Sequence, residues 1–143
     1  MRISEVIRRK GADVVTIRPE ATVTELLTLL GEHNIGAVVV SADDGRTVAG
    51  IVSERDVVRH LNSQGTGVLT SPVEALMTSE VLTCSVDDDL QTLARRMTEA
   101  RIRHLPVVED GRLRAIVSIG DIVKNRIDEL QAENEHLTDY VHG

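Results

Sequence analysis

The sequence predicts an α+β (mixed α/β) protein made of two similar strand-helix-strand-strand-helix units followed by a C-terminal helix. Two observations support this class: an internal repeat, and matching turn and helix-cap signals in both copies. The chain has 143 residues, 41% of them hydrophobic and 27% charged. That length suits one compact domain or two half-size units that bury a core together.

The repeat begins with a short strand and a helix. Residues 14–17 (VVTI) resemble residues 81–84 (VLTC), and 83 − 16 gives a shift of 67. Apolar residues then recur with helical spacing in both copies, at Val23, Leu26, Leu27 and Leu30 and again at Leu90, Leu93, Ala94 and Met97. Start signals support both helices, because Thr22 with Glu25 has capping-box spacing and residues 87–89 supply N-cap carboxylates.

A hairpin and a last helix follow in each copy. The middle strands are expected at residues 37–40 and 105–108, with Asp-Gly turns at residues 43–45 and 109–111. The last strands run into residues 50–56 and 115–121, where 118 − 53 gives a shift of 65. A further helix is expected to start at residues 71–74, where a capping box coincides with Pro72 at the first helical position. We therefore expect units at residues 1–66 and 67–126, joined by a polar linker at residues 62–70, and a helical tail at residues 127–143.

A serine and an aspartate three residues apart stand at the final strand-to-helix junction of both copies, as Ser53 with Asp56 and Ser118 with Asp121. A serine there can cap the helix, and a carboxylate one turn later can accept two hydrogen bonds from a ribose diol. Either motif alone is equally consistent with an ordinary helix cap. Its recurrence favours a ligand site, and both roles can coexist.

Residues 50–56 (GIVSERD) and 101–107 (RIRHLPV), together with the repeat, resemble the cystathionine β-synthase (CBS) domain pair, or Bateman module, over residues 3–126. The resemblance implies two β-α-β-β-α domains packed with pseudo-twofold symmetry and a nucleotide in the cleft between them. The ribose would bind Asp56 or Asp121 beside Ser53 or Ser118. The resemblance also implies that adenine packs against Val14 in one site and against Thr78 and Val81 in the other. Gly36 and Ala37, or Arg103 and His104, would close the pocket. The phosphate would bind Arg55 and either Arg103 or His104.

The second copy departs from the motif in two places. Ala115 replaces the first glycine, and Gly120 stands where the first copy has Arg55. We therefore expect unequal sites, with one of them short of a phosphate partner. For His104 the alternative is a partly buried histidine bonded to a backbone carbonyl.

These features predict a regulatory binder of an adenine nucleotide. AMP is the first candidate ligand, with ADP, ATP, NAD or S-adenosylmethionine behind it, and no cofactor is required. No enzyme is expected, because the sequence shows no nucleophile triad and no GxxxxGK[ST] loop. No metal site is expected either, because the histidines are scattered and the single cysteine, Cys84, suits a buried apolar position.

Composition restricts the partners. A net charge of −7 and 1% aromatic residues argue against nucleic-acid binding, and any purine must lie between aliphatic side chains. The sequence shows neither a membrane segment nor a signal peptide, which predicts a cytoplasmic protein.

The tail has a heptad-like apolar seam, formed by Val123, Ile127, Leu130, Asn134, Leu137 and Val141. It fits either a coiled-coil dimer contact or a helix folded back over its own domain. A homodimer is implied by the resemblance in both cases. The alternative function is a dimeric adaptor that binds another protein, with nucleotide binding incidental or absent.

Overall fold

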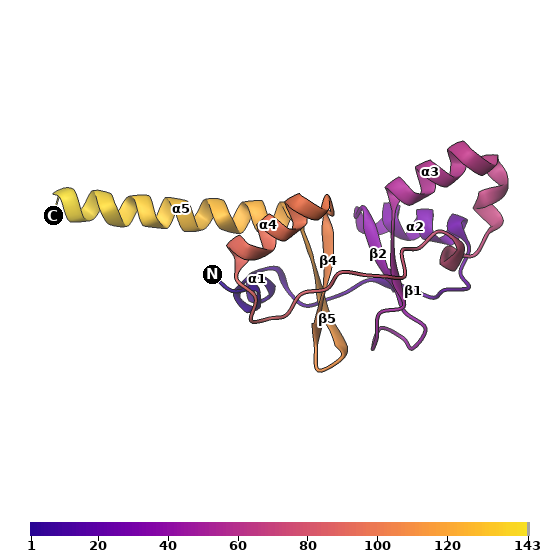
Figure 1. Cartoon of the computed structure of the whole chain (residues 1–143), viewed down its shortest axis with the longest axis horizontal. Helices are drawn as coiled ribbons and strands as arrows, with labels where there is room; N and C mark the ends of the chain where they lie inside the picture. The colour runs from indigo at the N-terminus through magenta and orange to yellow at the C-terminus, as the bar shows by residue number, and fades with distance from the viewer. Residues whose placement is uncertain (143) are drawn as a thin grey trace.

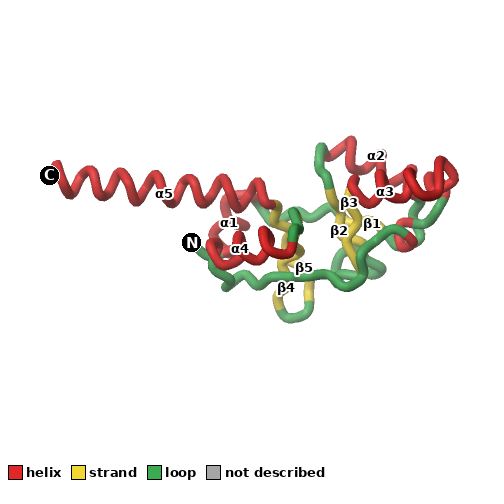
Figure 2. Tube along the Cα trace, turned by 45° about the horizontal axis from the view of Figure 1, so that its top comes forward, coloured by secondary structure: helices red, strands yellow, loops and turns green. Residues whose placement is uncertain are grey.

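The computed structural model describes residues 1–142 as two halves, each a small sheet with helices on one side. Figures 1 and 2 show the two sheets next to each other in the middle of the molecule, with the helices of each half on the outer sides. The first half consists of β1 (Thr16–Ile17), α2 (Val23–His33), β2 (Ala37–Val40), β3 (Gly50–Ser53) and α3 (Glu54–Gln64). The second half consists of α4 (Leu90–Ala100), β4 (His104–Glu109), β5 (Arg112–Ser118) and α5 (Ile119–His142).

The first half forms a three-stranded sheet in the order β1-β2-β3, with β1 parallel and β3 antiparallel to β2. The expected capping box starts α2, since the Thr22 side chain accepts from the Glu25 amide and the Glu25 side chain accepts from the Thr22 amide. Asp89 likewise caps α4. Both helices end in a left-handed residue at equivalent positions, Asn34 and Arg101, and 101 − 34 again gives 67. The repeat therefore extends to the backbone conformation.

Among the described residues the second half has two strands, β4 and β5, and here the expectation of a strand at residues 81–84 was wrong. Only Cys84 pairs, as an isolated parallel bridge to Val107. Directly after it the Ser85 amide donates to the Asp88 side chain at 2.8 Å. This turn ends the pairing with β4 on the C-terminal side of Cys84.

The expected helix and capping box at Ser71 were also wrong. Two 3₁₀ helices occupy this region, at Gly65–Thr70 and Val73–Ala75, and neither has a side-chain cap. The amides that a helix start would leave unpaired are already bonded to the first repeat, since Val73 donates to the Ala21 carbonyl and Glu74 to the Pro19 carbonyl. This pairing holds the segment against the residues that precede the N-terminus of α2.

Each half has its own hydrophobic core. In the first half Leu26 and Val52 are fully buried, and in the second Leu93 and Val117 are. An additional helix, α1 (Ile3–Lys10), precedes the first repeat in the chain but packs into the core of the second through Ile3, Val6 and Ile7. The end of α1 is thereby placed beside the junction of β5 and α5.

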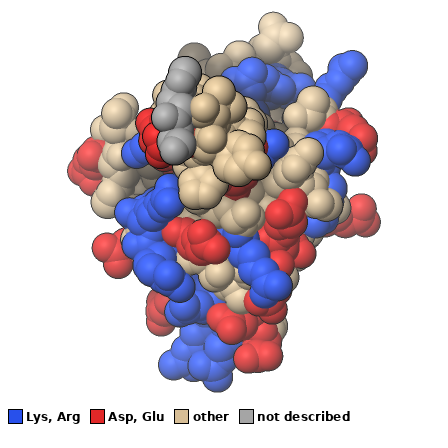
Figure 3. All heavy atoms as spheres, turned by 90° about the vertical axis from the view of Figure 1, so that its left-hand side faces the viewer, with Lys and Arg blue, Asp and Glu red and all other residues tan. Residues whose placement is uncertain are grey.

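The C-terminal helix α5 is continuous from Ile119 and projects away from both halves (Figure 1), which is not the folded-back arrangement. The seam residues Ile127, Leu130 and Leu137 are all about half exposed or more. On the face seen in Figure 3, Lys and Arg side chains lie among Asp and Glu side chains, so neither sign dominates it. Within residues 1–142 no helix combines the length and apolar character needed to cross a membrane.

Candidate functional site

A cavity of about 390 Å³ lies between the two halves and takes residues from both. This volume is within the range of small-molecule sites. The residues that line it are Lys10, Asp13, Val15, Asn34, Ile35, Gly36, Ala37, His104, Ile116, Ser118 and Asp121. Its apolar walls come from aliphatic side chains of both repeats.

Asp121 is one of two aspartates that line this cavity, with Asp13. It lies in the first turn of α5, where its Oδ2 accepts from the Ser118 amide at 2.9 Å and the Ser118 hydroxyl accepts from the Asp121 amide at 3.1 Å. The hydrogen bonds of the Asp121 carboxylate all go to Oδ2, so Oδ1 has no partner among residues 1–142. The aspartate therefore caps its helix and still has one acceptor oxygen available to a ligand.

Lys10, the last residue of α1, reaches into the cavity and pairs with Asp121. Its Nζ lies 2.5 Å from Asp121 Oδ2 and 2.8 Å from the Ile116 carbonyl oxygen. Burial by itself would raise the pKa of Asp121, but the hydrogen bonds from Lys10 and Ser118 outweigh it and keep this pKa below its ordinary value. The carboxylate is thus fully ionised at neutral pH.

His104 lies at the start of β4 and lines the same cavity. Burial lowers its pKa below the usual 6.5, and the charges of Lys10 and Arg103 add to this effect against those of Asp121 and Glu54. The imidazole is therefore neutral at pH 7 in this state. Within residues 1–142 its ring makes no hydrogen bond to a backbone carbonyl, unlike the ring of His60, so the bonded arrangement considered as the alternative is not present.

Gly36 comes close to this histidine from the first repeat. A Cβ built on Gly36 would lie 3.2 Å from Glu54 Oε1 and 3.8 Å from His104 Cε1. The Gly36 carbonyl also accepts from the Glu54 amide at 3.0 Å. A side chain at this position would crowd the place where the two repeats face each other.

The structure brings five of the twelve expected site residues together in the cavity: Gly36, Ala37, His104, Ser118 and Asp121. Seven others do not line it: Val14, Ser53, Arg55, Asp56, Thr78, Val81 and Arg103. Val14 packs instead against the core of the second half, and its neighbours Asp13 and Val15 face the cavity. Alternation along an extended chain explains this one-residue difference.

Asp56 repeats the capping geometry in the first half. Its Oδ2 accepts from the Ser53 amide at 2.8 Å and from the Ser53 hydroxyl at 3.0 Å. Nearby, Thr78 pairs with Ile51 of β3 as an antiparallel bridge. Gly50 is in close contact with this Thr78 segment, whose carbonyl oxygen would lie 2.8 Å from a Cβ on Gly50.

Sequence reasoning missed six lining residues: Lys10, Asp13, Val15, Asn34, Ile35 and Ile116. Ile116 could have been found by alternation, because Ala115 and Val117 on either side of it are buried in the core. Lys10 had no such signal, since 111 residues separate it from Asp121. Among the described residues it is the one Lys or Arg that lines the cavity.

Comparison with known proteins gives a consistent result. The family model described as "CBS domain" matches residues 3–63 and 73–128. CBS domain-containing protein YhcV of Bacillus subtilis is 30% identical over 98% of this chain and 97% of its own length. The crystal structure of a CBS-domain containing protein from Agrobacterium tumefaciens is 43% identical, covers 88% of this chain and 99% of that one, and has a TM-score of 0.84. A CBS domain protein from Pyrobaculum aerophilum, complexed with AMP, is 29% identical, covers 85% and 89% of the two chains, and has a TM-score of 0.74.

Proposed function

The chain belongs to the CBS-domain family, and on that premise we propose that it is a regulatory module that binds an adenine nucleotide between its two repeats. The observation that carries the proposal is the cavity lined by both halves, with Asp121 among its lining residues. Binding at such a place would order walls that belong to different halves. It would therefore shift the population toward one arrangement of the repeats.

The ribose is assigned to Asp121. Its unpartnered Oδ1 and its position at the start of α5 suit a cis diol, which can donate two hydrogen bonds to one carboxylate. Ser118, held beside it by the cap, is a further polar contact. A ligand without the diol would lose hydrogen bonds to a carboxylate, and hydrogen bonds to charged groups are stronger than those between neutral groups.

The adenine is assigned to the aliphatic walls. Val15, Ile35 and Ile116 line the cavity, and the one aromatic residue of the chain, Tyr140, lies on the exposed tail. A planar base packed between such side chains is stabilised by burial of its faces. The relative from Pyrobaculum aerophilum that is complexed with AMP supports an adenine ligand.

AMP is the ligand we favour among adenine nucleotides. One lysine lines the cavity, which suits a single phosphate group better than a di- or triphosphate chain. ADP, ATP, NAD and S-adenosylmethionine are the competing ligands. A second site at Asp56, with Ser53, Arg55, Thr78, Val81 and Arg103, remains part of the proposal as the weaker of two.

Titration calorimetry with AMP tests the ribose assignment. Asp121→Asn is expected to weaken binding about tenfold to a hundredfold, because a charged acceptor is lost. Asp56→Asn is the matched comparison, since Asp56 makes the same cap but does not line the cavity; it should affect only the weaker site and leave the tighter binding event unchanged. AMP affinity that Asp121→Asn leaves unchanged, alone or combined with Asp56→Asn, would reject the assignment.

The exposed seam of α5 favours a second candidate function, a dimeric adaptor. Leu137 and Val141 are 65% and 74% exposed on a helix that extends away from the body (Figure 1). We propose that a second copy pairs along this seam as a coiled coil. Removing residues 134–143 keeps Asp128 and Glu129 in place, and it is expected to convert a dimer to a monomer in analytical ultracentrifugation without loss of AMP binding. A truncated chain that still sediments with the molar mass of a dimer would exclude the tail as the dimer contact.

A further inference from the structure

Lys10 occupies one of the two carboxylate oxygens that a ribose diol spanning Asp121 would use. Asp121 Oδ2 already accepts two hydrogen bonds, one from the Ser118 amide and one from Lys10 Nζ. Each carboxylate oxygen has two lone-pair sites, so Oδ2 is saturated in this state while Oδ1 is open. A diol that spans both oxygens can therefore bind only if Lys10 gives up its place.

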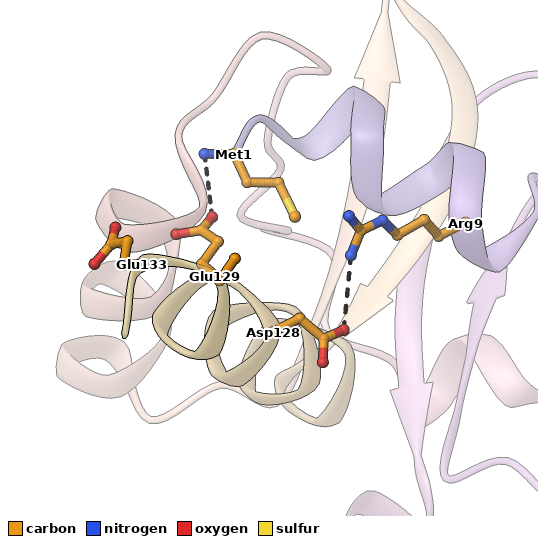
Figure 4. Close-up of a pocket in the computed structure, with 6 residues that line it drawn as sticks. Met1, Arg9, Asp128, Glu129 and Glu133 are labelled. Atoms are coloured by element: carbon orange, nitrogen blue, oxygen red, sulfur yellow. Dashed lines mark ion pairs between the residues drawn. The ribbon is translucent and has the colours of Figure 1, made fainter. Parts of the chain in front are cut away.

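The lysine can leave without movement of its helix. Ile3, Val6 and Ile7 anchor α1 in the core, and Arg9 is bonded to α5 through Asn125 at 3.3 Å and Asp128 at 3.6 Å. Figure 4 shows Arg9 of α1 directed at Asp128 of α5. The Lys10 side chain is one-third exposed, so its flexible four-carbon stem can swing while the backbone stays fixed.

A displaced ammonium in the cavity needs a new anionic partner. Asp13 also lines the cavity, but a nucleotide brings its own anion close to the same place. One methylene and one ester oxygen join the 5′-phosphate to the ribose, which keeps the phosphate within reach of a lysine whose Cα is fixed. A nucleoside has no such group, and a cationic adenosine derivative would repel the lysine.

We infer that Lys10 is a specificity-determining residue that neutralises Asp121 in the empty site and moves to the ligand phosphate on binding, so that the site selects anionic nucleotides over uncharged or cationic adenosine derivatives. The inference rests on the proposed adenine-nucleotide function. The inference adds a switch to that function, because the Lys10 ammonium pairs with Asp121 in the empty site and with the phosphate in the occupied site. A nucleoside would break the Lys10–Asp121 pair without replacing it.

The test measures AMP and adenosine affinities by calorimetry in the full chain and in Lys10→Met. We expect the unmodified chain to prefer AMP at least about tenfold, as a charge-assisted bond to phosphate implies. In Lys10→Met, AMP should bind about tenfold more weakly. Adenosine should bind about two- to fivefold more tightly, because the competing ion pair is partly exposed and weak. The ratio of AMP to adenosine affinity should therefore fall about 20- to 50-fold, which abolishes or reverses a tenfold preference for AMP.

Two controls separate this role from a structural one. Arg8→Met makes a comparable change two residues earlier on α1, outside the cavity, and should leave both affinities within about twofold. Lys10→Arg keeps the charge and should keep the preference for AMP. Equal weakening of AMP and adenosine in Lys10→Met, or no change in either, would overturn the inference while leaving the proposed function in place. Absence of binding of both ligands to the unmodified chain would overturn the function itself.

Discussion

The contact between Gly50 and the segment that enters the second repeat gives a strong prediction for Gly50→Ala. A Cβ on Gly50 would lie 2.8 Å from the Thr78 carbonyl oxygen and 2.5 Å from Met77 Sδ. The methionine side chain can move aside. The Thr78 carbonyl is backbone, and it accepts from the Ile51 amide at 3.0 Å while the Thr78 amide donates back at 2.9 Å.

The cost of Gly50→Ala follows from these contacts. To relieve the overlap, the backbone of Thr78 has to move away from β3, which lengthens both hydrogen bonds of the bridge. Overpacking of this kind costs about 1–3 kcal/mol. Replacing glycine also restricts the unfolded chain, which returns about 0.4–1 kcal/mol. We expect a net loss of about 1–2 kcal/mol in the free energy of unfolding.

Urea unfolding followed by circular dichroism measures this loss, since the chain has no tryptophan and a single tyrosine. Gly31→Ala is the matched control. Gly31 lies inside α2, and a Cβ added to it would have no atom within 4 Å, so alanine there should stabilise the protein by up to about 1 kcal/mol. A Gly50→Ala variant as stable as the unmodified chain would refute the close approach of the Thr78 segment.

Three further predictions concern side chains whose pKa the fold shifts. Burial, with the charge of Lys10, lowers the His104 pKa below 6.5, so the contribution of this side chain to stability is complete above pH 6.5 and is lost as the pH falls. In urea unfolding, the free energy of unfolding should therefore decrease less between pH 7 and pH 5 in His104→Gln than in the unmodified chain. An equal decrease in the two proteins would contradict this. Burial, reinforced by the charge of Asp88, raises the pKa of Cys84 to about 12, so its thiol should resist a disulfide reagent at pH 8 until urea unfolds the chain. Hydrogen bonds from Thr47 lower the pKa of Asp43 to about 2, and Asp43→Ala should accelerate amide hydrogen exchange at Thr47, whose N–H it accepts at 2.9 Å, as measured by NMR; unchanged exchange would exclude this contact.

The sequence was informative where a local signal decides the structure. The Thr22 capping box, the Asp89 cap and the Asp110-Gly111 turn with two positive φ angles all follow from residue type and spacing over a few positions. Asp121 and Ser118 could be assigned to one site for the same reason, since three residues at a strand-to-helix junction fix their relation.

Long-range pairing decided the features that the sequence did not predict. Nothing local at Ser71 indicates that the following amides bond to carbonyls of residues 19 and 21, which takes the place of the expected side-chain cap. No helix was expected at residues 3–10, and the spacing of Ile3, Val6 and Ile7 does not say which half buries them. Lys10 reaches Asp121 only because these residues pack in the second core, so the cation of the cavity depends on a tertiary contact.

The central claim is that an adenine nucleotide binds between the repeats with its ribose on Asp121. A crystal structure of the chain grown with saturating AMP measures this most directly. We expect electron density for one AMP in the cavity lined by Gly36, His104 and Asp121, with both ribose hydroxyls within hydrogen-bond distance of that carboxylate. A cavity that stays empty at saturating AMP, whether or not AMP is bound at Asp56, would contradict the account.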